Sequence, residues 1–80
     1  MKKILLIEDD ISLNEGICAT LSSREIEIFS AFSLEEGRAG FDKNTYDLVI
    51  LDLNLPDGNG LDFLKEIRKS SEIPVIILTA

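Results

Sequence analysis

The sequence has no histidine, and Cys18 is its only cysteine. The lack of histidine excludes His-based zinc sites and catalysis by Ser-His or Cys-His pairs. A single cysteine excludes a disulfide within the chain, and nothing indicates an oxidising compartment, so we expect a cytoplasmic protein. Long apolar runs are also lacking. Residues 73–80 are far too few to cross a bilayer, and the apolar patch after Lys3 ends at acids before it makes a signal sequence, so we expect no membrane partner.

Basic residues are few, because 8 Lys and Arg stand against 15 Asp and Glu and give a net charge of −7 at pH 7. This balance argues against a nucleic-acid surface within the chain and favours cations or basic protein surfaces as partners. Hydrophobic residues make up 45% and charged residues 29% of the chain, which is typical of a globular domain. The length of 80 residues allows one small domain at most.

Strand and helix patterns alternate along the chain. The first apolar run is continuously aliphatic, which predicts a strand buried on both faces of a parallel sheet, whereas the second alternates polar and apolar residues, which predicts a half-exposed edge strand. The order strand-helix three times and then a strand predicts a doubly wound parallel α/β fold. The expected strands are 3–7, 25–31, 46–51 and 73–78, and the expected helices are 11–23, 34–41 and 61–70.

The helices also show which side chains we expect to face the sheet. Asp9 or Asp10 is well placed to cap the first helix, and Ser33 with Glu36 forms a capping box before the second. Asp57 is expected to be a turn residue. Apolar spacing predicts inward-facing side chains at Leu13, Ile17 and Leu21 in the first helix and at Leu61, Leu64 and Ile67 in the third.

Acidic side chains follow the strands at the end where an open α/β sheet binds its ligands. Glu8 and Asp9 follow the first strand, Asp52 follows the third, and Thr79 follows the fourth. If the first and third strands are neighbours, three carboxylates converge and repel one another, so that either a pKa rises or a cation fills the gap. Oxygen ligands without His or Cys indicate Mg²⁺ or a similar hard ion.

Three separated segments carry a family resemblance: Leu-Ile-Glu-Asp-Asp at 6–10, Leu-Asp-Leu-Asn-Leu-Pro-Asp-Gly-Asn-Gly at 51–60, and Pro-Val-Ile-Ile-Leu-Thr-Ala at 74–80. Together, at this spacing, they resemble the response-regulator receiver domain of two-component systems. The details are most similar to receivers that carry a winged-helix DNA-binding domain. The resemblance covers the whole chain in register and implies a flavodoxin-like fold with strand order 2-1-3-4.

The resemblance also implies roles for the matching residues. Asp52 would be the phosphoacceptor, which attacks a phosphoryl group on a phosphohistidine of a sensor histidine kinase. Glu8 and Asp9 match the acidic pair that binds Mg²⁺ with Asp52, and the backbone carbonyl of Asn54 would complete the protein's share of the metal site. Thr79 matches the hydroxyl that contacts a phosphoryl oxygen and reports phosphorylation.

Receivers of this family have a fifth strand, two further helices and a lysine that pairs with the phosphoryl group. We therefore expect residues 1–80 to be an incomplete receiver domain of a longer protein, which binds DNA only through an output domain outside these residues. The strand at 73–78 would then be a bare aliphatic edge, so we expect the chain by itself to be marginally stable or to self-associate through this edge.

Two other functions compete with this interpretation. A Mg²⁺-dependent phosphatase with an aspartyl-phosphate intermediate needs a second acid two residues after its nucleophile, and Asn54 stands there, so we do not expect a dedicated enzyme. A receiver-like interaction module that is never phosphorylated is disfavoured by the intact Glu8, Asp9, Asp52 and Thr79. That alternative stays open for this chain because the family's lysine lies outside it. A beryllium fluoride phosphoryl mimic that binds only with Mg²⁺ would favour the phosphoacceptor.

Overall fold

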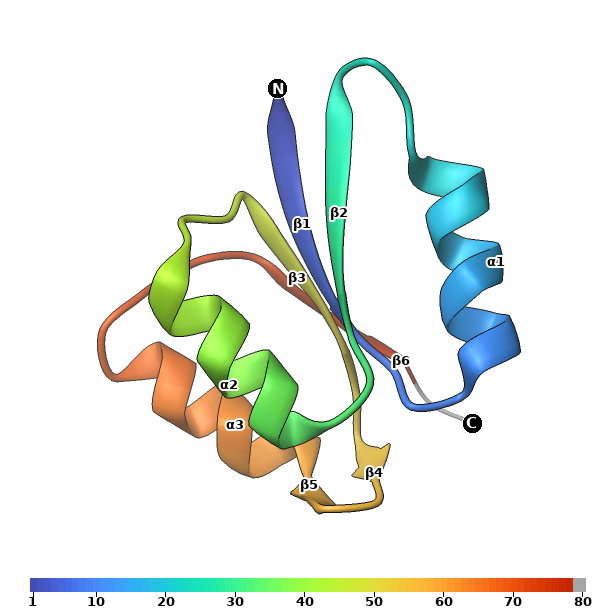
Figure 1. Ribbon diagram of the computed structural model, residues 1–80. Coiled ribbons are helices and arrows are strands. Elements are labelled where there is room, and N and C mark those ends of the chain that lie inside the picture. Colours follow the sequence, from blue (N-terminus) through green and yellow to red (C-terminus); the bar gives the residue numbers. More distant parts are fainter. Residues whose placement is uncertain (79–80) are drawn as a thin grey trace.

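Four parallel strands form a sheet with helices on both of its faces (Figure 1). The computed structural model describes residues 1–78, so the predicted hydroxyl of Thr79 lies outside the described residues. In chain order the elements are β1 (Lys2–Ile7), α1 (Ile11–Leu21), β2 (Ile26–Ala31), α2 (Leu34–Lys43), β3 (Leu48–Asp52), β4 (Asn54–Leu55), β5 (Gly58–Asn59), α3 (Gly60–Arg68) and β6 (Val75–Leu78).

The strand order in the sheet is β2-β1-β3-β6, and every neighbouring pair is parallel. Because β6 is the fourth strand of this sheet along the chain, the predicted order 2-1-3-4 is confirmed. The alternating strand β2 lies at one edge of the sheet, as predicted, and β6 lies at the other. The remaining two strands, β4 and β5, form a small antiparallel hairpin within the segment expected to be only a turn.

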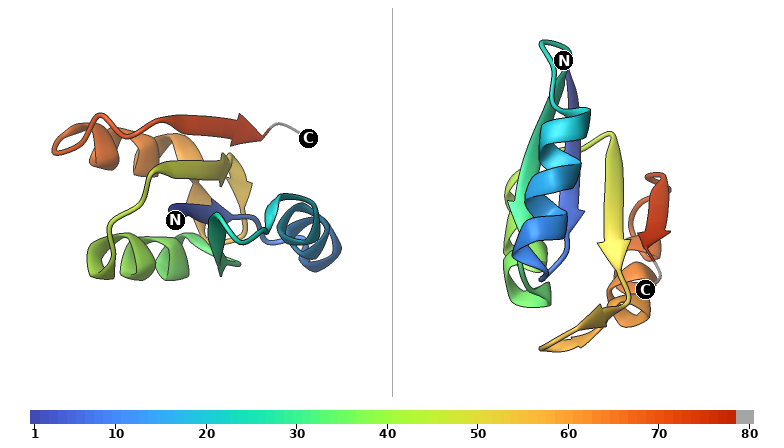
Figure 2. Two further views of the ribbon diagram at one scale, coloured as in Figure 1. Left: turned by 90° about the horizontal axis from the view of Figure 1, so that it is seen from above. Right: turned by 90° about the vertical axis from the view of Figure 1, so that its right-hand side faces the viewer.

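The two faces of the sheet hold separate apolar clusters. Figure 2 shows the sheet between α1 on one side and α2 and α3 on the other. Successive side chains of β1 alternate between the faces, as the pleat requires. Leu5 and Ile7 belong to the cluster that contains Leu34 of α2 and Ile67 of α3, whereas Ile4 and Leu6 belong to the cluster packed against α1. This two-sided burial explains why the sequence of β1 is continuously aliphatic.

The helix α1 is rotated relative to the sequence-based expectation. Leu13 is 48% exposed, and the neighbouring Asn14 is buried instead, with 1% of its surface exposed. The prediction for Leu13 was therefore wrong, while Ile17 and Leu21 do pack against the sheet. The rotation has a polar cause, because the Asn14 side chain reaches two backbone carbonyls at the end of the sheet, and a hydrogen-bonded amide tolerates burial there.

The third helix also departs from its prediction at one position. Leu61 is 43% exposed, and Phe63 is buried in its place together with Ile67, four residues further along the same helix face. Helix ends shift by one or two residues, since α1 ends at Leu21 and α2 continues to Lys43. Among residues 1–78, no helix combines the length and the apolar character needed to cross a membrane.

Candidate functional site

Three carboxylates meet at the carboxyl edge of the central strands. In the register of β1 against β3, Ile7 lies opposite Leu51, so the residues that follow, Glu8 and Asp52, come side by side. Glu8, Asp9 and Asp52 each place a carboxylate oxygen within 4.8 Å of those of the other two. The structure therefore brings together the three acids that the sequence placed at strand ends.

These acids differ in their exposure to water. Glu8 is 4% exposed and Asp52 is 7% exposed, whereas Asp9 is exposed. Burial raises the pKa of Glu8 above its ordinary value of 4.5, and the negative charges of Asp52 and Asp9 raise it further, although a hydrogen bond from the Asp10 N–H opposes the shift. The cluster is thus electrostatically unfavourable by itself, and a bound cation would relieve the repulsion.

The loop between β1 and α1 is fixed by two polar side chains. The Asn14 amide donates to the carbonyl oxygen of Glu8 at 3.0 Å and to that of Ala31 at 3.4 Å, which ties the end of β1 to the end of β2. Asp10 accepts the Leu13 N–H at 3.0 Å and caps α1, as one of the two predicted caps. Sequence reasoning missed Asn14, because an asparagine between apolar helix positions gives no signal of burial.

The loop after β3 is equally constrained. The Asp52 carboxylate accepts the Asn54 N–H at 3.2 Å, and the Gly60 N–H donates to the carbonyl oxygen of Leu53 at 3.0 Å. Both loops border an open cavity of about 500 Å³, which leaves room for a small ligand beside the carboxylates. Its lining residues are Glu8, Asp9, Asp10, Leu13, Asp52, Asn54 and Leu78.

The donor set of this cavity fits Mg²⁺. It presents carboxylate oxygens from Glu8, Asp9 and Asp52, with Asn54 at the rim. Hard divalent cations prefer oxygen ligands, and Mg²⁺ is usually held by a few carboxylates while other positions stay free for water or phosphate. The individual ligand roles, and that of Thr79 beyond β6, stay predictions.

The buried repulsion predicts the effect of Glu8→Gln on stability. Without metal at pH 7, we expect this variant to be more stable than the wild type by about 1–2 kcal/mol, because it removes a buried charge that lacks a cationic partner. Since the folded-state pKa of Glu8 is raised, its protonated form favours folding. The stability that the wild type gains from protonated Glu8 is complete below pH 4.5, the ordinary pKa of this group. It is lost as pH rises through the higher pKa of Glu8 in the folded protein.

Urea unfolding in the presence of a chelator, at pH 7 and at pH 4, measures this difference. The advantage of Glu8→Gln should shrink at pH 4, where Glu8 becomes protonated. Glu27→Gln is the matched control, because it makes the same change at an exposed position of β2. If Glu8→Gln is less stable than the wild type at pH 7, the carboxylates of Glu8, Asp9 and Asp52 do not destabilise the fold by repulsion.

The chain is similar in sequence to a known protein family and to curated proteins. The family model described as the response regulator receiver domain matches residues 4–80. The transcriptional regulatory protein YcbL of Bacillus subtilis is 46% identical over 95% of this chain and 34% of its own length. The KDP operon transcriptional regulatory protein KdpE of Escherichia coli is 35% identical over the whole chain and 36% of its own length. The chain thus spans about a third of the length of these relatives.

Solved structures agree with the observed fold. The non-phosphorylated HemR receiver domain of Leptospira biflexa superimposes with a TM-score of 0.91 at 37% identity and covers the whole chain, which spans 65% of that receiver. The response regulator TrrA of Thermotoga maritima, crystallised with Mg²⁺ and BeF, has a TM-score of 0.84 at 36% identity, over 96% of this chain and 66% of its own. TrrA has also been crystallised with the histidine kinase ThkA.

Proposed function

The chain belongs to the response regulator receiver domain family, and from this premise we propose that it accepts a phosphoryl group on Asp52 in a two-component signalling system. The observation that carries the proposal is the convergence of Glu8, Asp9 and Asp52 beside an open cavity. Receiver domains are signalling modules and not dedicated enzymes, so the phosphatase alternative no longer competes.

The site residues divide the chemistry between them. Glu8, Asp9, Asp52 and the backbone carbonyl of Asn54 would hold Mg²⁺, which when bound supplies positive charge beside the phosphoryl oxygens. Asp52 supplies the nucleophilic oxygen: a bond forms between this oxygen and phosphorus, the bond from phosphorus to the donor's histidine nitrogen breaks, and its electron pair leaves with the nitrogen. Thr79 would contact a phosphoryl oxygen of the product.

The whole protein's partners follow from the same premise. TrrA is crystallised with a histidine kinase, which supports a sensor histidine kinase as the phosphoryl donor. YcbL and KdpE are transcriptional regulatory proteins of which this chain spans about a third, which supports a cytoplasmic parent that regulates transcription through a DNA-binding domain outside residues 1–80. Within the described residues, β6 pairs only with β3, which supports a second copy at this edge as a partner of the 80-residue chain.

A phosphoryl mimic tests the proposed function against a receiver that is never phosphorylated. We expect beryllium fluoride together with Mg²⁺ to shift the amide NMR signals of Glu8, Asp9, Asp52 and Asn54, because the mimic completes an oxygen-coordinated site around Asp52. Beryllium fluoride without Mg²⁺ should leave these signals unchanged. The chain does not form a phosphoacceptor site if beryllium fluoride leaves these signals unchanged even with Mg²⁺. The same holds if beryllium fluoride shifts them equally with and without Mg²⁺.

A further inference from the structure

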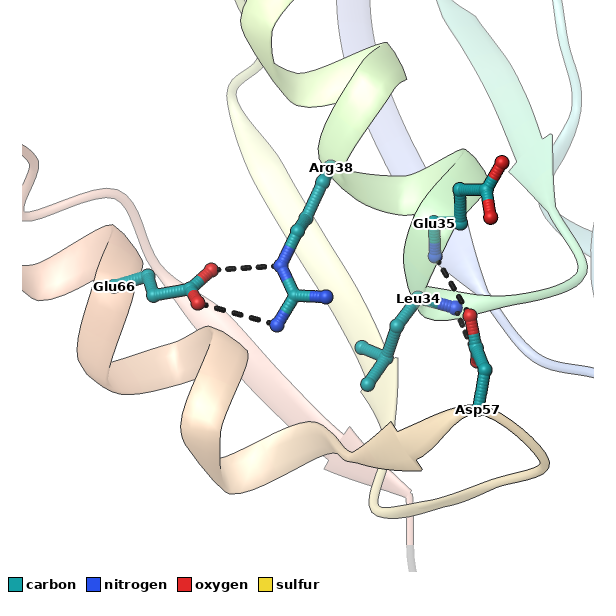
Figure 3. A network of polar contacts seen from close by, with 5 residues as sticks. All are labelled: Leu34, Glu35, Arg38, Asp57 and Glu66. Atoms are coloured by element: carbon teal, nitrogen blue, oxygen red, sulfur yellow. Dashed lines mark hydrogen bonds and ion pairs between the residues drawn. The ribbon is translucent and has the colours of Figure 1, made fainter.

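Asp57 connects the loop that follows the phosphoacceptor strand to a distant helix. Its carboxylate accepts the Leu34 N–H at 2.9 Å with one oxygen and the Glu35 N–H at 3.0 Å with the other. Figure 3 shows the carboxylate of Asp57, on the β4–β5 hairpin, aimed at the first turn of α2. The partners are 22 and 23 residues apart in sequence, so this is a tertiary contact and not an ordinary turn.

The contact completes the amino-terminal cap of α2. The first N–H groups of a helix have no partner within the helix. Ser33 serves one of them, because its side chain accepts the Glu36 N–H at 3.1 Å, while its carbonyl accepts the Gly37 N–H at 3.0 Å as the first hydrogen bond within the helix. Asp57 serves two more, the Leu34 and Glu35 N–H groups. These hydrogen bonds, first that from Leu34 and then that from Glu35, lower the pKa of Asp57, so the carboxylate is ionised at neutral pH.

The same contact fixes the hairpin that carries Asn54. Pro56 and Asp57 are the two residues between β4 and β5, and the strand pairs are Asn54 with Asn59 and Leu55 with Gly58. Gly58, with φ of +155°, lies so close to α2 that a Cβ there would be 2.7 Å from a methyl carbon of Leu34. Asp57 therefore holds the tip of the hairpin while the Asn54 N–H is held at Asp52, at its base.

A second charged contact at α2 does not reach the hairpin. The Arg38 guanidinium donates to both Glu66 oxygens, at 2.9 and 3.1 Å, and joins α2 to α3. Both side chains are more than 40% exposed, and neither touches β4 or β5 in these hydrogen bonds. Of these two charged contacts, the one made by Asp57 joins α2 to the hairpin.

We propose that Asp57 is a positioning residue for the metal site, which clamps the β4–β5 hairpin to α2 and thereby holds the backbone of Asn54 at the edge of the carboxylate cluster. This inference rests on the proposed function, because it assumes Mg²⁺ at Glu8, Asp9 and Asp52. Groups behind the metal ligands fix the orientation of those ligands, and their loss typically weakens metal binding by about 10- to 100-fold. Asp57 is three residues away from Asn54 along the chain and acts on it only indirectly, so its effect should be smaller.

The test is a Mg²⁺ titration followed by amide NMR on five proteins, which are the wild type, Asp57→Ala, Asp57→Asn, Ser33→Ala and Asp52→Asn. We expect the dissociation constant for Mg²⁺ to rise about fivefold in Asp57→Ala and by a smaller factor in Asp57→Asn, whose single carbonyl oxygen replaces only one acceptor. Ser33→Ala is the matched control, because it removes a cap from the same helix end without touching the hairpin. Its Mg²⁺ affinity should equal that of the wild type even though its urea midpoint falls.

Amide hydrogen exchange at the first turn of α2 separates a link to the metal site from a general change in the stability of α2. Because coupling between two sites is reciprocal, Mg²⁺ should slow exchange of the Leu34 and Glu35 amides more than that of the Glu36 and Gly37 amides, which Ser33 holds. In Asp57→Ala this selective slowing should disappear.

The inference is overturned if Asp57→Ala and Asp57→Asn bind Mg²⁺ as tightly as the wild type, or if Ser33→Ala weakens binding by the same factor. Failure of the proposed function has a different signature. In that case the wild type does not bind Mg²⁺, or Asp52→Asn binds it as tightly as the wild type, and Asp57 then has no metal site to position.

Discussion

Replacing Asp52 with asparagine should abolish phosphoryl transfer to the protein. The rate of transfer should fall by at least about 10³-fold, because a carboxamide is not a competent nucleophile. Removing the nucleophile of other proteins costs even more in rate. The change also removes one of the three carboxylates that converge on the cavity, so Mg²⁺ affinity should fall as well. The side chain keeps its size, and its oxygen is still able to accept the Asn54 N–H, so the fold should persist.

Transfer from a phosphorylated sensor kinase to the protein is measured by radiolabel and by the intact-mass increase of one phosphoryl group. Asp10→Asn is the matched control, since it makes the same substitution on the same edge of the sheet. Asparagine replaces aspartate well as a helix cap, so α1 should be unaffected. An Asp52→Asn protein that still gains an acid-stable or acyl phosphoryl group at the wild-type rate would show that another residue is the acceptor.

Gly60→Ala should strongly reduce the free energy of unfolding. Gly60 is buried, and a Cβ at this position would collide with the carbonyl oxygen of Asp52 and lie 3.0 Å from the Cα of Leu53. Both neighbours are backbone atoms that cannot rotate away. We expect a loss of about 3 kcal/mol, the upper end for overpacking, and a fall of roughly 12 °C or more in Tm for a domain of this size.

The strain at residue 60 should also displace Asp52, so Mg²⁺-induced NMR shifts should weaken in the fraction that stays folded. Gly16→Ala is the control, because a Cβ there meets no atom within 4 Å and the residue lies on the exposed side of α1. Alanine favours a helix over glycine by about 1 kcal/mol, so this variant should gain stability. Equal thermal unfolding of Gly60→Ala and the wild type would contradict the close approach to Asp52.

The requirement at Gly60 is one of space, which the sequence did not reveal. Within residues 1–78, the residue with a positive φ is Gly58, so Gly60 has a backbone conformation that other residues adopt. A glycine in a turn-rich segment normally indicates conformational freedom. Only the path of the chain from Asp52 through the hairpin to α3 shows that the backbone at Gly60 lies against the backbone of Asp52 and Leu53.

The sequence by itself determined the fold and the location of the site. The aliphatic run of the first strand specified burial on both faces, and alternation in 25–31 specified an edge strand, because burial of a strand face dictates which positions are apolar. Carboxylates placed directly after the first and third strands could converge only if those strands were neighbours, which the parallel register confirms. The local pattern, together with the strand order that the family resemblance implies, is therefore sufficient to predict where Glu8, Asp9 and Asp52 lie.

Only the tertiary structure decided which polar side chains support that site. Leu13 is exposed and Asn14 is buried because two carbonyls at the sheet end lie within reach of the Asn14 amide, and hydrogen bonding outweighs the apolar pattern there. Asp57 was identifiable as a turn residue, yet its partners are the N–H groups of a helix 22 and 23 residues earlier in the chain. Such contacts depend on distances between elements that no local periodicity encodes, because they arise when the packed sheet and helices bring separate chain segments together.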